Sequence, residues 1–407
     1  MKRIMMLVLA SLLLLTACGD SEDSSTTEAV SDGETTTTQG TDTTAPATET
    51  TAPEAEAEPV VFGFFGPLTG PTAQAGNALL HGAELRVKEL NESGGILGRP
   101  VELVTCDDKS EPEDGVTCVQ RLIDQDGVDA IVGTLHSPII SATAPIVGEN
   151  EVPMVGAGTG VAWCNEGHEY VWRETANSDA NAAAIKQALQ ESDWSNLGVL
   201  YQNDDYGASG AESLEAIEGI EVVASETYNP ADRDYSGQII KLLGADLDVI
   251  AVWGLGDTLG PVTNQLRQQG WDGPIIGAEG YTLPEVVEVA GENVDGVIFA
   301  SLYYIPEEAA AYPEENVRAF LESYVAEFGE LPASDNAYRA YDGATILAYA
   351  MEQAGSVDGS AVKDAINAIS GLEGLAGTFD YATGGCEGIQ TSKLWEYEGT
   401  SVTPYGQ

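Results

Sequence analysis

The chain has 407 residues, with 16 Lys and Arg against 66 Asp and Glu, so its formal net charge is −50 at pH 7. So acidic a chain excludes nucleic-acid binding, which depends on clusters of lysine and arginine. The 43% hydrophobic and 20% charged residues are compatible with a folded core, and the length predicts two domains or slightly more.

The N-terminus has the pattern of an export signal. Lys2 and Arg3 precede an apolar run over residues 4–15, which is too short to span a membrane as a helix. The Leu-Thr-Ala that precedes Cys18 is typical of a bacterial lipobox. We therefore predict a lipoprotein signal peptide over residues 1–17 and lipidation of Cys18. An ordinary signal peptide followed by a chance cysteine is the alternative.

Residues 18–58 are predicted to be the lipidated cysteine and a disordered tether. The segment after the cysteine is rich in Ser, Thr and Glu, and it has no Lys, Arg or aromatic residue. Such a composition cannot bury enough surface to order the backbone. The tether would hold the folded body at the outer face of the cell membrane, or in the periplasm.

Four cysteines remain if Cys18 is lipidated, and an exported protein can oxidise them. Cys106 ends a predicted strand and Cys118 lies in the next helical segment, so this is the local pair among three possible pairings. Cys164 and Cys386 would then form the second disulfide. A zinc site is the alternative, but the sequence has no CxxC motif and only three histidines. We predict no metal and no cofactor.

From Pro59 onward, short β-branched runs alternate with longer helical patterns. The runs predict strands at 60–65, 101–106, 130–132, 152–155, 197–201, 249–253, 274–277 and 296–300, and helices at 73–91, 113–126, 138–149, 179–191, 208–217 and 258–269. This alternation predicts an α/β fold with parallel sheets covered by helices on both faces. The body is too long for one core, so we expect two such sheets. Ligands of open α/β sheets bind beyond the carboxyl ends of the strands.

Six motifs occur at or near the ends of these elements. They are Gly66-Pro67-Leu68-Thr69-Gly70-Pro71, a glycine-rich turn at 91–100, Asp107-Asp108, the segment 131–137, Asp205-Tyr206-Gly207 and Gly277-Ala278-Glu279-Gly280. In this order and spacing, the series resembles the leucine/isoleucine/valine-binding family of type I periplasmic substrate-binding proteins. The resemblance covers residues 59–407. It implies a lipoprotein that closes two lobes on a small solute and delivers it to the permease of an ABC importer, without catalysis.

The resemblance also implies two doubly wound parallel-sheet lobes with three interlobe crossings. Lobe 1 would contain residues 59–178 plus 302–388, and lobe 2 would contain residues 179–301 plus 389–407. Cys164 and Cys386 then fall in the same lobe, so their disulfide would not obstruct lobe motion.

Two residues of lobe 1 match ligand contacts of the family. Ser137 begins a helical segment, where a hydroxyl and free N–H groups can bind a carboxylate; a plain helix cap is the alternative. Thr159 is the candidate hydroxyl contact, although a gapless match puts Gly160 at that position. Gly158 lets the backbone approach a ligand closely, and His136 adjoins the cleft.

Two residues of lobe 2 complete the predicted site. Tyr206 matches a family tyrosine that reaches the ligand, with core packing as its alternative. Glu279 matches the glutamate that neutralises the α-ammonium group of an amino acid; its alternative is a solvated loop acid.

The sequence departs from the family pattern at Ala75 and Leu255, where the family has aromatic residues in the cleft. Trp163 and Tyr281 are candidates to refill the side-chain pocket. A dinucleotide site is rejected because Leu259 replaces the third glycine of the motif, and the hydrolase motifs GxSxG and HExxH do not occur. We therefore predict a non-enzymatic, monomeric binder of a branched-chain or similar small amino acid. Amides, urea or aromatic acids are the alternative ligands, and a non-transport sensor is the further alternative.

Overall fold

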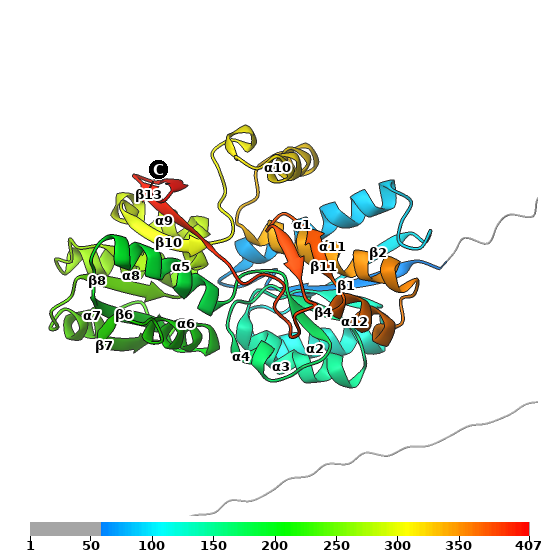
Figure 1. The fold of residues 1–407 in the computed structure, drawn as a ribbon, viewed down its shortest axis with the longest axis horizontal. Coiled ribbons are helices and arrows are strands. Elements are labelled where there is room, and N and C mark those ends of the chain that lie inside the picture. The colour runs from blue at the N-terminus through cyan, green and yellow to red at the C-terminus, as the bar shows by residue number, and fades with distance from the viewer. Residues whose placement is uncertain (1–57, 407) are drawn as a thin grey trace, which may run out of the picture. The chain divides into compact units, whose positions relative to one another are not determined.

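The computed structural model describes residues 58–406. The predicted signal peptide, Cys18 and almost all of the predicted tether lie outside the described residues. The described residues belong to one unit of the chain, which contains two large β-sheets and their helices (Figure 1). None of the helices between residues 58 and 406 is both long enough and apolar enough to cross a membrane.

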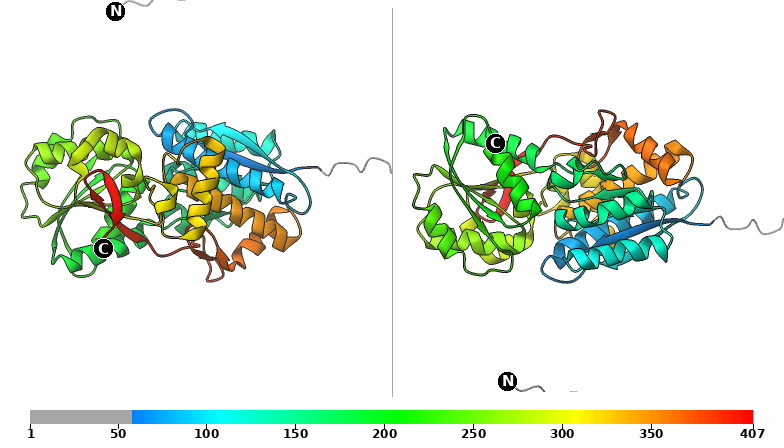
Figure 2. Two further views of the ribbon diagram at one scale, coloured as in Figure 1. Left: turned by 90° about the horizontal axis from the view of Figure 1, so that it is seen from above. Right: turned by 90° about the horizontal axis from the view of Figure 1, so that it is seen from below.

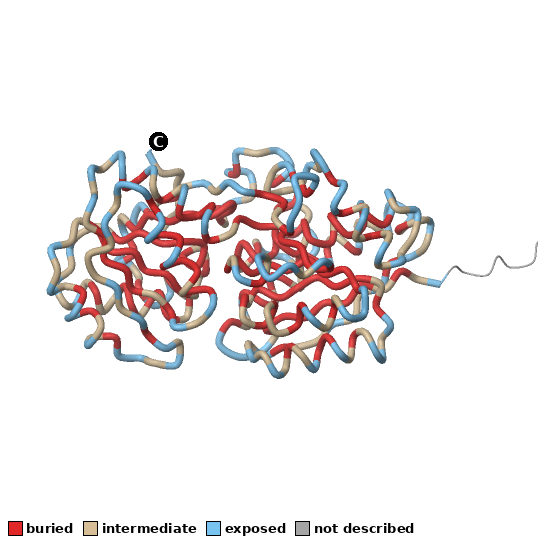
Figure 3. The backbone as a smooth tube through the Cα atoms, turned by 60° about the horizontal axis from the view of Figure 1, so that its bottom comes forward, coloured by how far each residue is buried: buried red, intermediate tan, exposed pale blue. Residues whose placement is uncertain are grey.

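The first sheet has five parallel strands in the order β2-β1-β3-β4-β5. The strands are β1 (Val60–Gly66), β2 (Val101–Asp107), β3 (Ala130–Val132), β4 (Met154–Gly156) and β5 (Val171–Arg173). The helices of this first lobe are α1 (Ala73–Glu92), α2 (Pro112–Asp124), α3 (Ser137–Glu149), α4 (Ala162–Asn165), α10 (Glu315–Phe328), α11 (Asn336–Ala354) and α12 (Gly359–Asn367). Helices lie on both faces of the sheet, so strand β1 is almost wholly buried, and α10 packs against α1 (Figures 2 and 3).

The second sheet has seven strands in the order β14-β13-β10-β9-β8-β6-β7. Its parallel strands are β6 (Asn196–Gln202), β7 (Glu221–Tyr228), β8 (Val249–Trp253), β9 (Ile275–Gly277) and β10 (Val297–Ser301), and β13 (Lys393–Glu398) and β14 (Ser401–Pro404) add an antiparallel hairpin. The helices of this second lobe are α5 (Ser178–Glu191), α6 (Asp205–Glu215), α7 (Ser236–Leu242), α8 (Gly256–Gln268) and α9 (Pro284–Ala290). The predicted α/β fold with two largely parallel sheets is confirmed.

The chain passes between the two sheets three times, after β5, after β10 and before β13 (Figure 1). A small sheet of β11 (Ser370–Glu373) and β12 (Thr378–Asp380) precedes the third crossing. The predicted strand at 152–155 begins later, at Met154, because Val152 instead bonds back to the end of α3. The helix predicted at 208–217 begins earlier, because the Asp204 side chain caps it by accepting from the Gly207 N–H at 2.9 Å.

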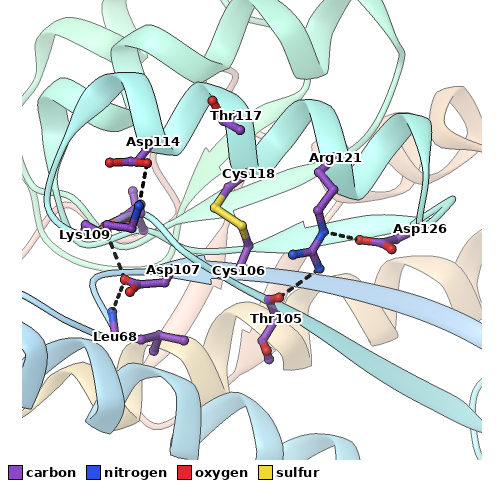
Figure 4. Close-up of a disulfide and its surroundings, with 12 residues drawn as sticks. Leu68, Thr105, Cys106, Asp107, Lys109, Asp114, Thr117, Cys118, Arg121 and Asp126 are labelled. Carbon is purple, nitrogen blue, oxygen red and sulfur yellow. Dashed lines mark hydrogen bonds and ion pairs between the residues drawn. A yellow bond between two sulfur atoms is a disulfide. The ribbon is translucent and has the colours of Figure 1, made fainter.

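Two disulfides lie in the first lobe and have the predicted pairing. Cys106 on β2 joins Cys118 on α2 with a Cα–Cα distance of 5.6 Å, and Asp107 beside it accepts from backbone N–H groups (Figure 4). Cys164 on α4 joins Cys386, which precedes the third crossing, with a Cα–Cα distance of 5.7 Å. Zinc binds the thiolate form of cysteine, so the disulfides argue against the alternative zinc site.

Candidate ligand-binding site

A pocket lies where the loops that follow the strands of both sheets meet. The first lobe contributes loop residues after β3 and β4 and the start of α11, and the second lobe contributes loop residues after β6, β8 and β9. The pocket is lined by Leu135, His136, Ser137, Pro138, Thr159, Asp204, Tyr206, Leu255, Glu279, Gly280, Leu283, Asp335, Asn336 and Arg339. This is the position at which open α/β sheets bind their ligands.

Ser137 is the first residue of α3, and the N-cap position belongs to His136, which makes no side-chain cap. The plain helix-cap role considered for Ser137 is therefore not what the structure shows. The Ser137 Oγ atom accepts a hydrogen bond from the Gly160 N–H at 3.0 Å. Its own proton can still be donated, and the first N–H groups of a helix attract anions. This corner of the pocket suits a carboxylate.

The loop Ala157 to Val161 follows β4, and we call it the ligand loop. The structure places the Thr159 side chain in the pocket, whereas Gly160 bonds to Ser137 through its backbone. Gly158 does not line the pocket; a Cβ atom there would lie 2.9 Å from the Ser137 Oγ. Glycine at 158 therefore serves the close packing of the ligand loop against α3.

Glu279 follows β9 and begins a short 3-10 helix (Glu279–Thr282) in the second lobe. Its Oε1 atom accepts a hydrogen bond from the Thr159 hydroxyl at 2.5 Å, and its Oε2 atom accepts one from the Asn181 amide at 2.6 Å. The side chain is buried, so it is not the solvated loop acid considered above. Burial raises the pKa of Glu279, while the Arg339 guanidinium opposes that rise.

Tyr206 lies in the first turn of α6 and is buried at the pocket wall. Its ring packs 6.2 Å from the ring of Trp253, centroid to centroid. The hydroxyl has no hydrogen-bond partner among residues 58–406. Burial raises the pKa of Tyr206 well above its ordinary value, so the hydroxyl keeps its proton and is available as a donor.

His136 lines the pocket but adds no positive charge to it. Its Nε2 atom shares a hydrogen bond of 2.9 Å with the Thr72 hydroxyl. Burial lowers the pKa of His136 to about 4, so the imidazole is neutral near pH 7.

The start of α11 supplies a polar wall that sequence reasoning missed. Arg339 pairs with Asp335 at 2.6 Å and donates to the Ala157 carbonyl oxygen of the ligand loop at 2.9 Å. Asp335 also accepts from the Thr282 hydroxyl of the second lobe at 2.9 Å. The Asp335–Arg339 spacing of four residues predicts an ion pair on one helix face, but nothing in the sequence shows that this face meets the ligand loop.

The apolar part of the pocket consists of Leu135, Pro138, Leu255 and Leu283. Leu255 is one of the two predicted departures from the family pattern, and it does line the pocket. The residues expected to refill the pocket do not line it. Trp163 is buried beneath the guanidinium of Arg173, and the Tyr281 hydroxyl bonds to Thr263 inside the second lobe.

The charged groups of the pocket favour a ligand that carries a positive charge. Its lining has three acids, Asp204, Glu279 and Asp335, against one cation, Arg339. An ammonium group beside Glu279 would offset the excess negative charge, and a carboxylate could occupy the corner of Ser137 and α3. The geometry of the pocket suits the recognition of a small zwitterion.

Comparison with known proteins identifies the family of the chain. The model of the periplasmic binding protein family matches residues 59–399. A Brucella melitensis Leu/Ile/Val-binding protein homologue is 28% identical over 333 residues, which cover 80% of this chain and 88% of the relative.

Two solved structures share the fold. The branched-chain amino acid transporter substrate binding protein LivJ of Streptococcus pneumoniae, in complex with isoleucine, is 27% identical with a TM-score of 0.76, over 85% of this chain and 98% of that one. A solute binding protein from R. palustris, in complex with benzoate, is 20% identical with a TM-score of 0.73, over 86% of this chain and 96% of that one. The chain therefore belongs to the periplasmic binding protein family, among relatives named Leu/Ile/Val-binding proteins.

Proposed function

We propose that this protein binds a branched-chain or similar small amino acid outside the cytoplasm and delivers it to the permease of an ABC importer. A signal peptide would export the chain, and lipidation of Cys18 would anchor it as a monomer at the outer face of the cell membrane. The observation that carries the ligand class is the pairing of Ser137 at the start of α3 with Glu279 of the other lobe in one pocket.

In this proposal each end of the amino acid meets a group of opposite charge. The carboxylate binds at the Ser137 hydroxyl and the N-terminus of α3. The ammonium group binds Glu279, and the Thr159 and Tyr206 hydroxyls reach the ligand from the two lobes. The apolar wall of Leu135, Pro138, Leu255 and Leu283 supports an aliphatic ligand side chain.

The ligand contacts are shared between the lobes, so ligand would favour the closed arrangement through contacts that only this arrangement provides. Hydrogen bonds that join the lobes at the pocket support this proposal: Thr159 donates to Glu279, and Thr282 donates to Asp335. We place the boundaries of the lobes near 178, 301 and 388.

An aromatic acid is the second candidate ligand, because a structural neighbour was solved in complex with benzoate. The pocket disfavours it electrostatically, since a ligand with a carboxylate and no ammonium group would add negative charge beside three acids. No comparable observation favours an amide, urea or a sensor role.

Calorimetry with three related probes tests the ligand class. L-leucine carries both charged groups, 4-methylpentanoate lacks the ammonium group, and 3-methylbutylamine lacks the carboxylate. We expect saturable binding of L-leucine, or of L-isoleucine or L-valine, and binding of the two truncated probes weakened by at least about a hundredfold. Tight binding of 4-methylpentanoate or benzoate together with no binding of these amino acids would reject the proposal.

A further inference from the structure

Arg173 lies outside the pocket and contacts both the ligand loop and the segment before the third crossing. It ends strand β5, immediately before the first crossing between the lobes, and its side chain is fully buried. Its Nη2 atom donates to the Gly160 carbonyl oxygen of the ligand loop at 2.6 Å. Its guanidinium stacks on the Trp163 ring, 4.2 Å from the centroid.

The same arginine also contacts the residues that precede the third crossing. Its Nε atom lies 3.2 Å from an Oε atom of Glu387, and its backbone N–H donates to the Cys386 carbonyl oxygen at 2.8 Å. The other Oε atom of Glu387 accepts from the Asn177 side chain at 3.0 Å, and Asn177 is the N-cap of α5 at the end of the first crossing. Glu387 therefore links both crossings through one carboxylate.

The Cys164–Cys386 disulfide is a second connection between the ligand loop and the third crossing. Cys164 lies on α4, which follows the ligand loop directly, and Cys386 precedes Glu387. The Ser178 N–H at the start of α5 adds a third contact, because it donates to the Thr159 carbonyl oxygen at 2.9 Å. Ligand loop, first crossing and third crossing are thus joined by hydrogen bonds, an ion pair and a covalent bond.

We propose, relying on the proposed function for the identity of the ligand, that Arg173 and Glu387 are positioning residues of the ligand loop and that the Cys164–Cys386 disulfide sets ligand affinity. The group holds Thr159 in place relative to the two crossings about which the lobes move. A lobe movement and a displacement of the ligand loop are then energetically coupled, because both change the same contacts. The Cys106–Cys118 disulfide lies in the same lobe but joins β2 to α2 and touches neither crossing.

The two disulfides provide a matched pair of variants. Replacing Cys164 and Cys386 by Ser should weaken binding of L-isoleucine by between about 2- and 30-fold, the range expected for coupling networks. Replacing Cys106 and Cys118 by Ser should lower the thermal midpoint without changing the dissociation constant. Equal dissociation constants in both variants and the wild type would overturn the proposal, as would equal weakening in both.

Single substitutions separate positioning from general stability. Arg173→Lys keeps the charge but cannot reach both Gly160 and Glu387, since an ammonium group lacks the planar fork of a guanidinium. Arg173→Lys and Glu387→Gln should each weaken L-isoleucine binding at a temperature where calorimetry shows the variant fully folded. Folded variants with wild-type affinity would contradict the positioning role.

Hydrogen exchange provides a readout that does not depend on any ligand. The Gly160 N–H bonds to the Ser137 Oγ and the Val161 N–H bonds to the Ser209 Oγ, both at 3.0 Å, so both amides report the position of the ligand loop. Their protection should fall when the Cys164–Cys386 disulfide is removed and stay unchanged when the Cys106–Cys118 disulfide is removed. Unchanged protection in both variants would refute the proposal. If the wild-type protein binds no amino acid, only the proposed function is rejected. The hydrogen-exchange comparison then still tests the positioning role of the group.

Discussion

Replacing Glu279 tests the ammonium site more sharply than any other single substitution. Glu279 is only 7% exposed, and its carboxylate lies beside the Thr159 hydroxyl and the Asn181 amide. Removing one partner of a buried charge pair costs about 3–5 kcal/mol, which raises a dissociation constant by about a hundredfold to several thousandfold. Glu279→Ala should therefore weaken binding of L-isoleucine by at least about a hundredfold.

The structure also predicts that Glu279→Ala destabilises the protein itself. It leaves the donors of Thr159 and Asn181 without their acceptor, at a cost of about 1–3 kcal/mol for each group left unsatisfied. Glu279→Gln is therefore the cleaner variant, because its amide oxygen can still accept from Thr159 while the negative charge is lost. The control is Glu215→Gln, which removes the same charge from the exposed end of α6.

Isothermal calorimetry with L-isoleucine measures the effect, and differential scanning calorimetry measures each variant's stability. We expect Glu279→Gln to bind at least about thirtyfold more weakly than wild type and Glu215→Gln to bind within about twofold. A dissociation constant for Glu279→Gln within about threefold of wild type would refute the ammonium role of Glu279. The ligand would then be one without a cationic group.

Three further predictions address the disulfides, the lobe movement and a buried acid. Mass spectrometry of unreduced peptides should recover Cys106 with Cys118 and Cys164 with Cys386; free thiols or crossed pairs would contradict the structure. Solution scattering should show a smaller radius of gyration at saturating L-isoleucine, and an unchanged radius would count against closure. Glu174 is buried beside Arg173, Arg339 and Asp342. Neither of its carboxylate oxygens has a hydrogen-bond partner among residues 58–406. Burial raises the pKa of Glu174 from 4.5 to about 8. Between pH 4.5 and about 8 the folded protein holds the Glu174 proton more tightly than the unfolded chain does. The contribution of Glu174 to the free energy of unfolding is therefore fully present below pH 4.5 and is lost as the pH rises through about 8. Denaturant titrations of Glu174→Gln should show a shallower loss of stability over that range, by up to about 1.4 kcal/mol per pH unit, and identical slopes would contradict the shift.

The sequence predicts those parts of the fold that are carried by local patterns. The strand β8 appears as a run of buried residues at the predicted positions, and the start of α3 at Ser137 follows from its local pattern. Strand β5 was not predicted because one of its three residues is Arg173, so the apolar run that marks β3 and β9 is only two residues long there. The hairpin of β13 and β14 was not predicted, although Trp395 and Tyr397 of β13 are buried and alternate with Glu396 and Glu398; β14 has only four residues, and none of them is buried.

The candidate site likewise contains residues that the sequence predicts and residues that it does not. Ser137, Thr159, Tyr206 and Glu279 follow strands, so the rule for α/β sheets directs attention to them. Arg339 instead bonds to Ala157, which lies 182 residues earlier in the chain. Such a contact depends on which face of α11 meets the first sheet, and local sequence does not determine it. The resemblance to the family likewise gave no reason to single out Arg173.

The most direct test of the central claim is the stability of the protein in the presence of candidate ligands. Residues 58–407, produced without the signal peptide and tether, would be heated with L-leucine, L-isoleucine, L-valine, benzoate, urea and acetamide in turn. A ligand at 100 times its dissociation constant adds about 2.7 kcal/mol to the free energy of unfolding. We predict a clear rise in the thermal midpoint with at least one of the three amino acids and none with benzoate, urea or acetamide. A rise with one of these last three compounds and none with the amino acids would contradict the proposal that the pocket recognises a zwitterion.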